Sequence, residues 1–415
     1  SASPSAIVRR SRQSIWPAIT VEEAIRIVEE HAEYALLTDR TRTVFITDIK
    51  TGDILAENVV ATKAHPEVRT SVKDGYAVVA SDGKGIRKVV AGTTAGLLAS
   101  DILRPGTICR VNTGSMVPDG ADAVVQVENT RIVEHNNFEE IAVEILVELE
   151  NLDEDYHAEI GILAASERNF VQIFRKPKVA VISTGNEVVD SRSNGCPLGS
   201  VRDTNRPQLI ALLKENNFKC VDIGILPDEK KKIEEGLKAA LTLCDVTVCS
   251  GGVSMGEKDY LKDVLQNQLN FTIKFGRVMI KPGLPTTFAY GKWNNKEKLV
   301  FALPGNPVST WVTAQLFLLP TLKKMAGWEH NQHTVISVRL SETIKLDRRP
   351  EYRRACLLPD PKNLPRAICL EKAQMSSRLL SIRGANLLLK LPPCTDTKST
   401  VQKNEVVEAI VIGRL

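Results

Sequence analysis

Long apolar runs are missing from this 415-residue sequence. No uninterrupted stretch reaches the ~18 apolar residues that a membrane-spanning helix needs, so membrane insertion is not expected. The amino-terminal arginines Arg9, Arg10 and Arg12 are not followed by an apolar segment, so this region does not have the pattern of a secretory signal. We interpret residues 1–15 as a flexible linker tail.

Paired cysteines and a strong net charge are also missing. The eight cysteines are scattered without a C-x-x-C pair, which argues against a zinc site and against a disulfide framework. Reduced thiols in a cytoplasmic protein are the simplest explanation. The formal net charge is only +4, and the densest arginine cluster, residues 348–354, is short. A nucleic-acid partner is therefore not expected.

Familiar catalytic signatures are absent as well. The sequence has no G-x-S-x-G elbow, no P-loop and no H-E-x-x-H motif, and residue spacing alone defines no catalytic triad. Any function must therefore be inferred from less specific features, namely loops, carboxylates and cations that the fold brings together.

The pattern of predicted helices and strands changes along the chain and predicts several domains. Thr20 and Glu23 form a T-x-x-E capping box that opens a helix. Short β-type runs separated by turn residues fill 61–147 and indicate an all-β module. Strand–helix alternation over 177–328 predicts a doubly wound α/β domain. Residues 329–415 again have β-type runs and predict a small C-terminal β domain. Within the α/β domain we expect helices at 206–216, 230–243, 260–268 and 308–325, and strands at 220–225, 245–249, 273–280 and 299–303.

Three glycine-bearing loops each follow an apolar run of strand length in the α/β region. They span 250–260, with Gly251, Gly252 and Ser254, then 281–285, and then 304–309. Loops at the carboxyl ends of parallel strands form the rim where open α/β sheets bind ligands. Because glycine lets backbone N–H groups approach an anion closely, these loops predict a phosphate-bearing ligand.

Carboxylates and basic side chains accompany the loops. Asp259 either caps a helix or holds a cation, and Asp228, which follows a predicted strand, would reach the same rim and favours Mg²⁺. Glu187 could join them. Lys281 either binds an anion or is an ordinary surface lysine. For Arg349 and Arg354 the alternatives are an oxyanion site and a solvated cluster. Ser376 and Asp74 carry no clear signal from spacing alone.

The motifs together resemble the E domain of gephyrin-type proteins, the molybdenum insertases of the animal type. They occur in the family's order from residue 16 to the carboxyl end. The matching segments are 72–77, 112–122, 183–187, 202–205, 250–260, 279–288, 302–309, 349–352 and 374–378.

This resemblance implies an elongated homodimeric enzyme that completes molybdenum cofactor synthesis. Such enzymes bind adenylylated molybdopterin, insert molybdate and release AMP with the help of Mg²⁺. The resemblance also implies a discontinuous, partly helical, elongated N-terminal subdomain formed by 16–60 and 148–176. The linker-like tail fits a fused protein with a separate adenylylating domain upstream.

The family's functional positions can be carried over residue by residue. Asp228 and Asp259 match the metal-linked acidic positions at the adenylate, and Ser254 and Ser309 match the loop serines beside that ligand. The resemblance implies two further groups: a molybdate pocket of Lys281, Pro282, Arg349 and Ser376, and cleft residues Asp74, Thr113 and Glu187.

The chain departs from the family pattern in two places, and a second function must be weighed. Residues 148–158 replace a longer family segment near the dimer seam, and 65–70 differ before the Asp-Gly-Tyr-Ala motif. Gephyrin also anchors receptors through an aromatic residue on the first helix, where this chain has Ile25. An aliphatic side chain lacks that aromatic contact, so receptor-loop binding is the weaker hypothesis.

Overall fold

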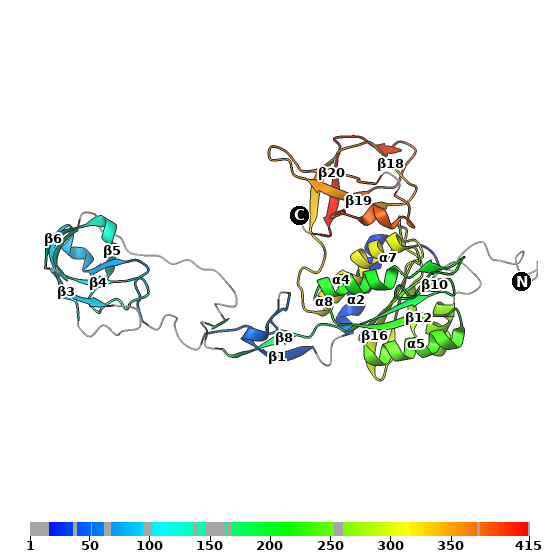
Figure 1. Cartoon of the computed structure of the whole chain (residues 1–415), viewed down its shortest axis with the longest axis horizontal. Coiled ribbons are helices and arrows are strands. Elements are labelled where there is room, and N and C mark those ends of the chain that lie inside the picture. The colour runs from blue at the N-terminus through cyan, green and yellow to red at the C-terminus, as the bar shows by residue number, and fades with distance from the viewer. Residues whose placement is uncertain are drawn as a thin grey trace, which may run out of the picture. The chain divides into compact units, whose positions relative to one another are not determined.

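The structure is a computed structural model of the whole chain (Figure 1). It describes residues 16–35, 40–50, 52–61, 68–93, 102–136, 139–145, 163–164, 166, 168–252, 260–371 and 374–413. The chain forms two compact units. The larger unit takes in 1–43, 49–56 and 172–415, and the smaller unit takes in 44–48 and 57–171. The replaced segment 148–158 lies outside the described residues.

The larger unit contains a six-stranded mixed sheet in the order β12-β9-β13-β16-β15-β14. The first four strands run parallel, and β15 and β14 are antiparallel to their neighbours. The strands are β9 (Val179–Thr184), β12 (Cys220–Leu226), β13 (Val246–Ser250), β14 (Thr272–Phe275), β15 (Thr287–Trp293) and β16 (Lys296–Leu303).

Helices cover both faces of this sheet, which confirms the doubly wound prediction. Along β9, Val179 and Val181 join one buried cluster whereas Ala180 and Ile182 join another. This alternation is the period of two expected of a strand that is buried on both faces. The helices are α2 (Val21–Tyr34), α4 (Asn205–Glu215), α5 (Lys230–Leu243), α6 (Tyr260–Asp263) with η4 (Val264–Gln268), and α7 (Pro307–Thr313), η5 (Ala314–Leu318) and α8 (Leu319–Met325).

The capping box at the start of α2 forms as predicted. The Thr20 hydroxyl accepts a hydrogen bond from the backbone N–H of Glu23 at 3.1 Å, which satisfies one of the free donors of the first turn. Val21, Ala24 and Val28 are buried on one face of the helix, while Ile25 is half-buried.

The strand predicted at 273–280 is wrong in its second half. β14 ends at Phe275, and the next residue, Gly276, packs against the Trp16 ring so closely that a Cβ there would lie 2.6 Å from it. Beyond it, Val278 and Lys281 form isolated bridges with Ile19 and Glu351. The second glycine-bearing loop therefore does not follow a parallel strand, and β15 was not foreseen.

A closed five-stranded barrel ends the larger unit, in the order β17-β20-β19-β21-β23. Val338, Leu340, Leu387 and Leu389 are among its buried residues. The sequence predicts strands at 335–340, 385–391 and 406–412, which correspond to β17, β21 and β23, whereas β19 and β20 were missed. The barrel strands are β17 (Val335–Leu340), β19 (Glu351–Leu358), β20 (Arg366–Ile368), β21 (Leu387–Leu391) and β23 (Val406–Val411), with a separate pair, β18 (Ile344–Lys345) and β22 (Thr400–Val401).

The smaller unit is built on a six-stranded sheet in the order β5-β2-β4-β3-β7-β6. Tyr76, Ile108, Val125 and Val143 lie in its core, in agreement with the predicted all-β module. Its strands are β2 (Gly75–Val78), β3 (Gly85–Thr93), β4 (Thr107–Val111), β5 (Ala123–Gln126), β6 (Thr130–His135) and β7 (Glu140–Ile145). Two short sheets complete the fold: β1 (Thr41–Phe45) with β8 (Phe170–Phe174), and β10 (Val188–Val189) with β11 (Val201–Arg202).

None of the helices in the described ranges combines the length and the apolar character that crossing a bilayer requires. The finer subdomain limits assigned from the sequence stay a prediction.

A half-buried histidine, His333, is expected to make the larger unit sensitive to acid. The His333 ring lies 2.9 Å from the Gln315 carbonyl oxygen, and burial, together with nearby Lys323, lowers the pKa of His333 to about 4. Because this folded-state value lies below the ordinary one of 6.5, the stabilisation is complete above pH 6.5 and is lost as the pH falls towards 4. The difference corresponds to about 3 kcal/mol in the free energy of unfolding.

Urea titrations at neutral and acidic pH measure this effect. His333→Gln is expected to remove this part of the loss, whereas His330→Gln, at an exposed position, should keep it. The same acid loss in wild type and His333→Gln would contradict the assignment.

Candidate functional site

A cavity of about 1260 Å³ opens beside the carboxyl ends of β9 and β13, where the three glycine-bearing loops meet the barrel. Both sides of the cavity belong to the larger unit. Its lining residues come from segments 183–188, 201–205, 250–252, 281–285, 304–309 and 374–379, together with Asp228, Arg349 and Arg353.

The structure brings most of the predicted site residues to this one cavity. Nine of them line it: Glu187, Asp228, Gly251, Gly252, Lys281, Pro282, Ser309, Arg349 and Ser376. Ser254 and Asp259 lie outside the described residues, so their roles stay predictions. Asp74 and Thr113 belong to the smaller unit, where Asp74 accepts hydrogen bonds from the Thr113 backbone N–H at 2.6 Å and from the Thr113 hydroxyl at 3.1 Å.

Glycine is required at the first loop. Gly251 and Gly252 have φ values of +85° and +67°, which side-chain-bearing residues rarely adopt. A Cβ on Gly251 would lie 2.7 Å from the Thr184 carbonyl oxygen, and one on Gly252 would lie 2.8 Å from the Thr184 hydroxyl. This packing holds the backbone at the rim where an anion could be bound.

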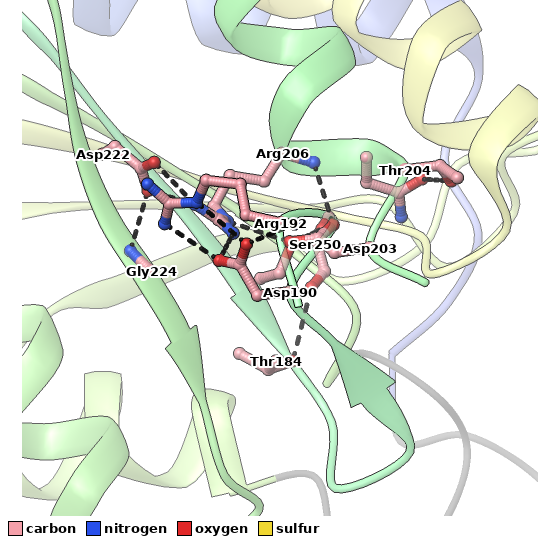
Figure 2. Close-up of polar contacts among 11 residues, drawn as sticks. Thr184, Asp190, Arg192, Asp203, Thr204, Arg206, Asp222, Gly224 and Ser250 are labelled. Atoms are coloured by element: carbon pink, nitrogen blue, oxygen red, sulfur yellow. Dashed lines mark hydrogen bonds and ion pairs between the residues drawn. The ribbon is translucent and has the colours of Figure 1, made fainter. Parts of the chain in front are cut away.

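A buried arginine behind the rim binds three carboxylates (Figure 2). Arg206, at the start of α4, has only 3% of its side chain exposed. Its Nε donates to Asp203 at 2.8 Å, and its terminal nitrogens donate to Asp222 and Asp190, each at 2.6 Å. Burial opposes the charge, but the hydrogen bonds that Arg206 donates to these carboxylates outweigh it and raise the pKa of Arg206. Arg206 therefore remains a cation.

This network fixes two of the cavity loops. The Asp203 carboxylate accepts a hydrogen bond from Ser183 at 2.9 Å, and the Ser183 hydroxyl lies 3.1 Å from that of Ser250, which precedes the first glycine pair. The neighbouring Asn205 amide donates to the Gly305 carbonyl oxygen at 2.8 Å. Sequence reasoning missed Arg206, although the Asp-x-x-Arg spacing at the start of a predicted helix was a usable signal.

Cations and carboxylates alternate around Lys281, at the start of the second glycine-bearing loop. Lys281 Nζ lies 3.2 Å from both Asp347 Oδ2 and Glu351 Oε2. Arg349 pairs with Asp347 at 3.1 Å, and Arg353 pairs with Glu351 at 3.0 Å. Partial burial tends to raise the pKa of Asp347, but its contacts with Arg349 and Lys281 lower it to about 2. Three cations and two carboxylates leave this cluster with a net positive charge that suits an anion.

Backbone contacts hold both cavity walls in place. The Lys281 N–H donates to the Pro350 carbonyl oxygen and the Tyr352 N–H donates to that of Lys281, each at 2.8 Å. On the other side, the Asn306 amide donates to the Ser376 hydroxyl at 3.0 Å, which ties the two loops together. The barrel and the α/β domain therefore share the walls of one cavity.

Neither alternative for Arg354, an oxyanion ligand or a solvated cluster, agrees with the structure. Its side chain is buried, with the residue 1% exposed, and donates to the Ser381 hydroxyl at 3.3 Å. Successive residues of a strand point to opposite faces, so Arg353 lines the cavity instead. The arginine cluster at 348–354 does supply a cation to the cavity, but that cation is Arg353, because the side chain of Arg354 points to the other face of the strand.

The carboxylates present fit a magnesium ion shared with phosphate. In the described part of the chain, no three metal-ligating side chains converge, so an all-protein metal cage is not formed there. Asp228 and Glu187 line the cavity, and the Asp228 N–H donates to the Asn186 side chain at 3.0 Å, next to Glu187. Mg²⁺ commonly takes one or two carboxylates and completes its shell with phosphate oxygens and water.

Sequence comparisons match two consecutive regions of the chain. Residues 19–168 match the MoeA N-terminal region, domains I and II, and residues 180–324 match a probable molybdopterin binding domain. The chain is similar to the molybdenum cofactor synthesis protein cinnamon of Drosophila melanogaster, with 35% identity over 97% of this chain and 67% of that protein. Gephyrin of Dictyostelium discoideum is 33% identical over 97% of this chain and 63% of its own length. The chain thus spans about two thirds of these relatives.

A bacterial relative and a solved structure are also molybdopterin biosynthesis proteins. Molybdopterin molybdenumtransferase of Haemophilus influenzae is 34% identical over 68% of this chain and 72% of that protein. The crystal structure of a MoeA molybdopterin biosynthesis protein from Pyrococcus horikoshii superposes with a TM-score of 0.72 at 25% identity, covering 96% of this chain and all of that one. Together with the cavity at the shared sheet edge, these similarities show that the chain belongs to the MoeA-type molybdopterin molybdenumtransferase family of molybdenum cofactor biosynthesis.

Proposed function

We propose that the chain inserts molybdate into adenylylated molybdopterin and releases AMP with the help of Mg²⁺. One observation carries this proposal: a single cavity is lined by glycine-bearing loops with two carboxylates, Asp228 and Glu187, and also by the net-positive cluster around Lys281. The first wall, formed by the loops and the two carboxylates, suits a phosphoanhydride, and the second, formed by the net-positive cluster, suits a tetraoxo dianion.

The residues divide this work between the two walls. Backbone N–H groups near Gly251 and Gly252 approach the phosphate, with Ser309 beside them. Lys281, Arg349 and Ser376 orient the molybdate through charge and hydrogen bonds. Asp228 and Glu187 would hold Mg²⁺, which when bound offsets the negative charge of the phosphate oxygens.

The partners implied by family resemblance belong to the same proposal. A homodimer and an upstream adenylylating domain in the full-length protein are expected, and light scattering on the purified chain tests the first. Receptor-loop binding stays the weaker hypothesis, because Ile25, which packs partly against the core of the larger unit, lacks the aromatic contact.

The decisive experiment measures AMP release from adenylylated molybdopterin with molybdate and Mg²⁺ added or withheld. Release that requires both, and a product that activates a molybdenum-dependent apoenzyme, is the expected result. Tight binding of the adenylate without release would refute the insertase proposal.

The molybdate wall is tested through Lys281. Lys281→Gln is expected to raise the molybdate KM about 10-fold, because hydrogen bonds to charged groups contribute about 1.5–3 kcal/mol. AMP release measured against molybdate concentration gives this value. Lys231→Gln, at an exposed site on α5, serves as the control and should match wild type. An unchanged KM in Lys281→Gln would remove Lys281 from the molybdate wall.

A further inference from the structure

A second cavity, the basic groove, adjoins the main one. Its volume is about 800 Å³, and it shares Leu284 and Arg349 with the main cavity. Arg277, Lys345 and Arg348 add three cations to its lining, and Asp347 is the one carboxylate among its described lining residues.

The one described carboxylate of the groove, Asp347, already forms ion pairs with Arg349 and Lys281. Asp347 Oδ1 lies 3.1 Å from Arg349, and Asp347 Oδ2 lies 3.2 Å from Lys281 of the main cavity. Among the described residues, no carboxylate lies within ion-pair distance of Arg277, Lys345 or Arg348. In the described part of the chain these three groove cations therefore have no ion-pair partner, and their mutual repulsion makes an anion favourable there.

The lining side chains of the groove carry a larger net positive charge than those of the main cavity. Four cations face one carboxylate in the groove, whereas the described lining of the main cavity has four cations and three carboxylates. Guanidinium forks match oxyanions, but the remaining lining includes Met279 and Leu284, which offer no polar contacts. Such a site attracts an anion with its hydration shell rather than binding it tightly.

We propose that the basic groove is a recruitment site for a tetrahedral oxo dianion, which then passes Arg349 into the main cavity. This proposal rests on the proposed function for the identity of the dianion as molybdate. A positively charged groove raises the local anion concentration and the association rate by about 10-fold or more, and salt screens this effect.

The test uses the double variant Arg277→Gln/Arg348→Gln, which leaves every proposed ligand of the main cavity intact. We expect the molybdate KM for AMP release to rise about 10-fold at low ionic strength, with kcat unchanged. In ~0.5 M salt the difference should shrink below about 2-fold. Lys219→Gln/Lys231→Gln removes the same charge from exposed sites elsewhere and should behave as wild type.

Equilibrium dialysis provides a readout that does not need activity. Wild type is expected to retain a weaker second equivalent of molybdate at low salt, which the double variant loses. Displacement of that equivalent by inorganic phosphate supports a groove for tetrahedral dianions generally, and retention against phosphate supports one selective for molybdate. A second equivalent that persists in the double variant, or an unchanged KM, overturns the proposal. If wild type releases no AMP, the proposed function fails while dialysis still decides the groove.

Discussion

Replacing Arg206 with methionine is expected to lower the free energy of unfolding by about 3–5 kcal/mol, the usual cost of removing one partner from a buried ion pair. The side chains of Arg206 and Asp203 are 3% and 2% exposed, so Asp203 would lose its cation in a place that water barely reaches. Asp190 and Asp222 would lose the same cation, and of the two Asp190 would keep its ion pair with the exposed Arg192. This loss is a large share of the ~5–15 kcal/mol that stabilises a typical domain.

Urea unfolding of matched variants measures this loss. Arg206→Lys keeps the charge but not the planar fork and should fall between wild type and methionine. Arg192→Gln removes the exposed partner of Asp190. The Arg192 side chain is 79% exposed, so this variant should lower the free energy of unfolding far less than Arg206→Met does. A methionine variant as stable as wild type would show that the carboxylates relax into solvent and that the network does not support the rim.

Replacing Asp228 with asparagine is expected to slow AMP release about 100-fold, because a neutral amide holds Mg²⁺ far less strongly than a carboxylate does. The substitution preserves the shape of the side chain, and the N–H of residue 228 can still donate to Asn186. The effect should therefore fall on metal binding and turnover rather than on folding.

Single-turnover AMP release across a range of Mg²⁺ concentrations checks this prediction. Partial recovery at high Mg²⁺ is expected for a weakened metal ligand. Asp396→Asn, at an exposed position in the barrel, is the control for loss of one negative charge. An Asp228→Asn variant with wild-type rate and Mg²⁺ dependence would leave Glu187, or a residue outside the described ranges, to hold the ion.

Local patterns in the sequence predicted much of the fold. The capping box of Thr20 and Glu23 predicted the start of α2. The continuous apolar run at 179–182 is typical of a strand that is buried on both faces, as β9 is. The helix predicted at 230–243 matches α5. These features depend on neighbours in the chain, which is why the sequence shows them. The end of β14 at Phe275 was not predicted, and the next residue, Gly276, packs against the Trp16 ring from a distant part of the chain.

The residue types of the site were also readable from the sequence: glycines at the rim, Asp228 and Glu187, and a lysine–arginine wall, all of which line one cavity. Only the tertiary structure decided how these charges are balanced. Arg206 reaches Asp222 across 16 positions of the chain, and Lys281 reaches Glu351 across 70, so no local pattern reveals either pair. The same holds for the choice of Arg353 over Arg354 and for the basic groove, which depend on strand register and on the docking of the barrel. The sequence alone therefore determines which residue types are available for the site. The net charge of each cavity, and the access that it gives to a ligand, depend on which distant segments the fold brings into contact.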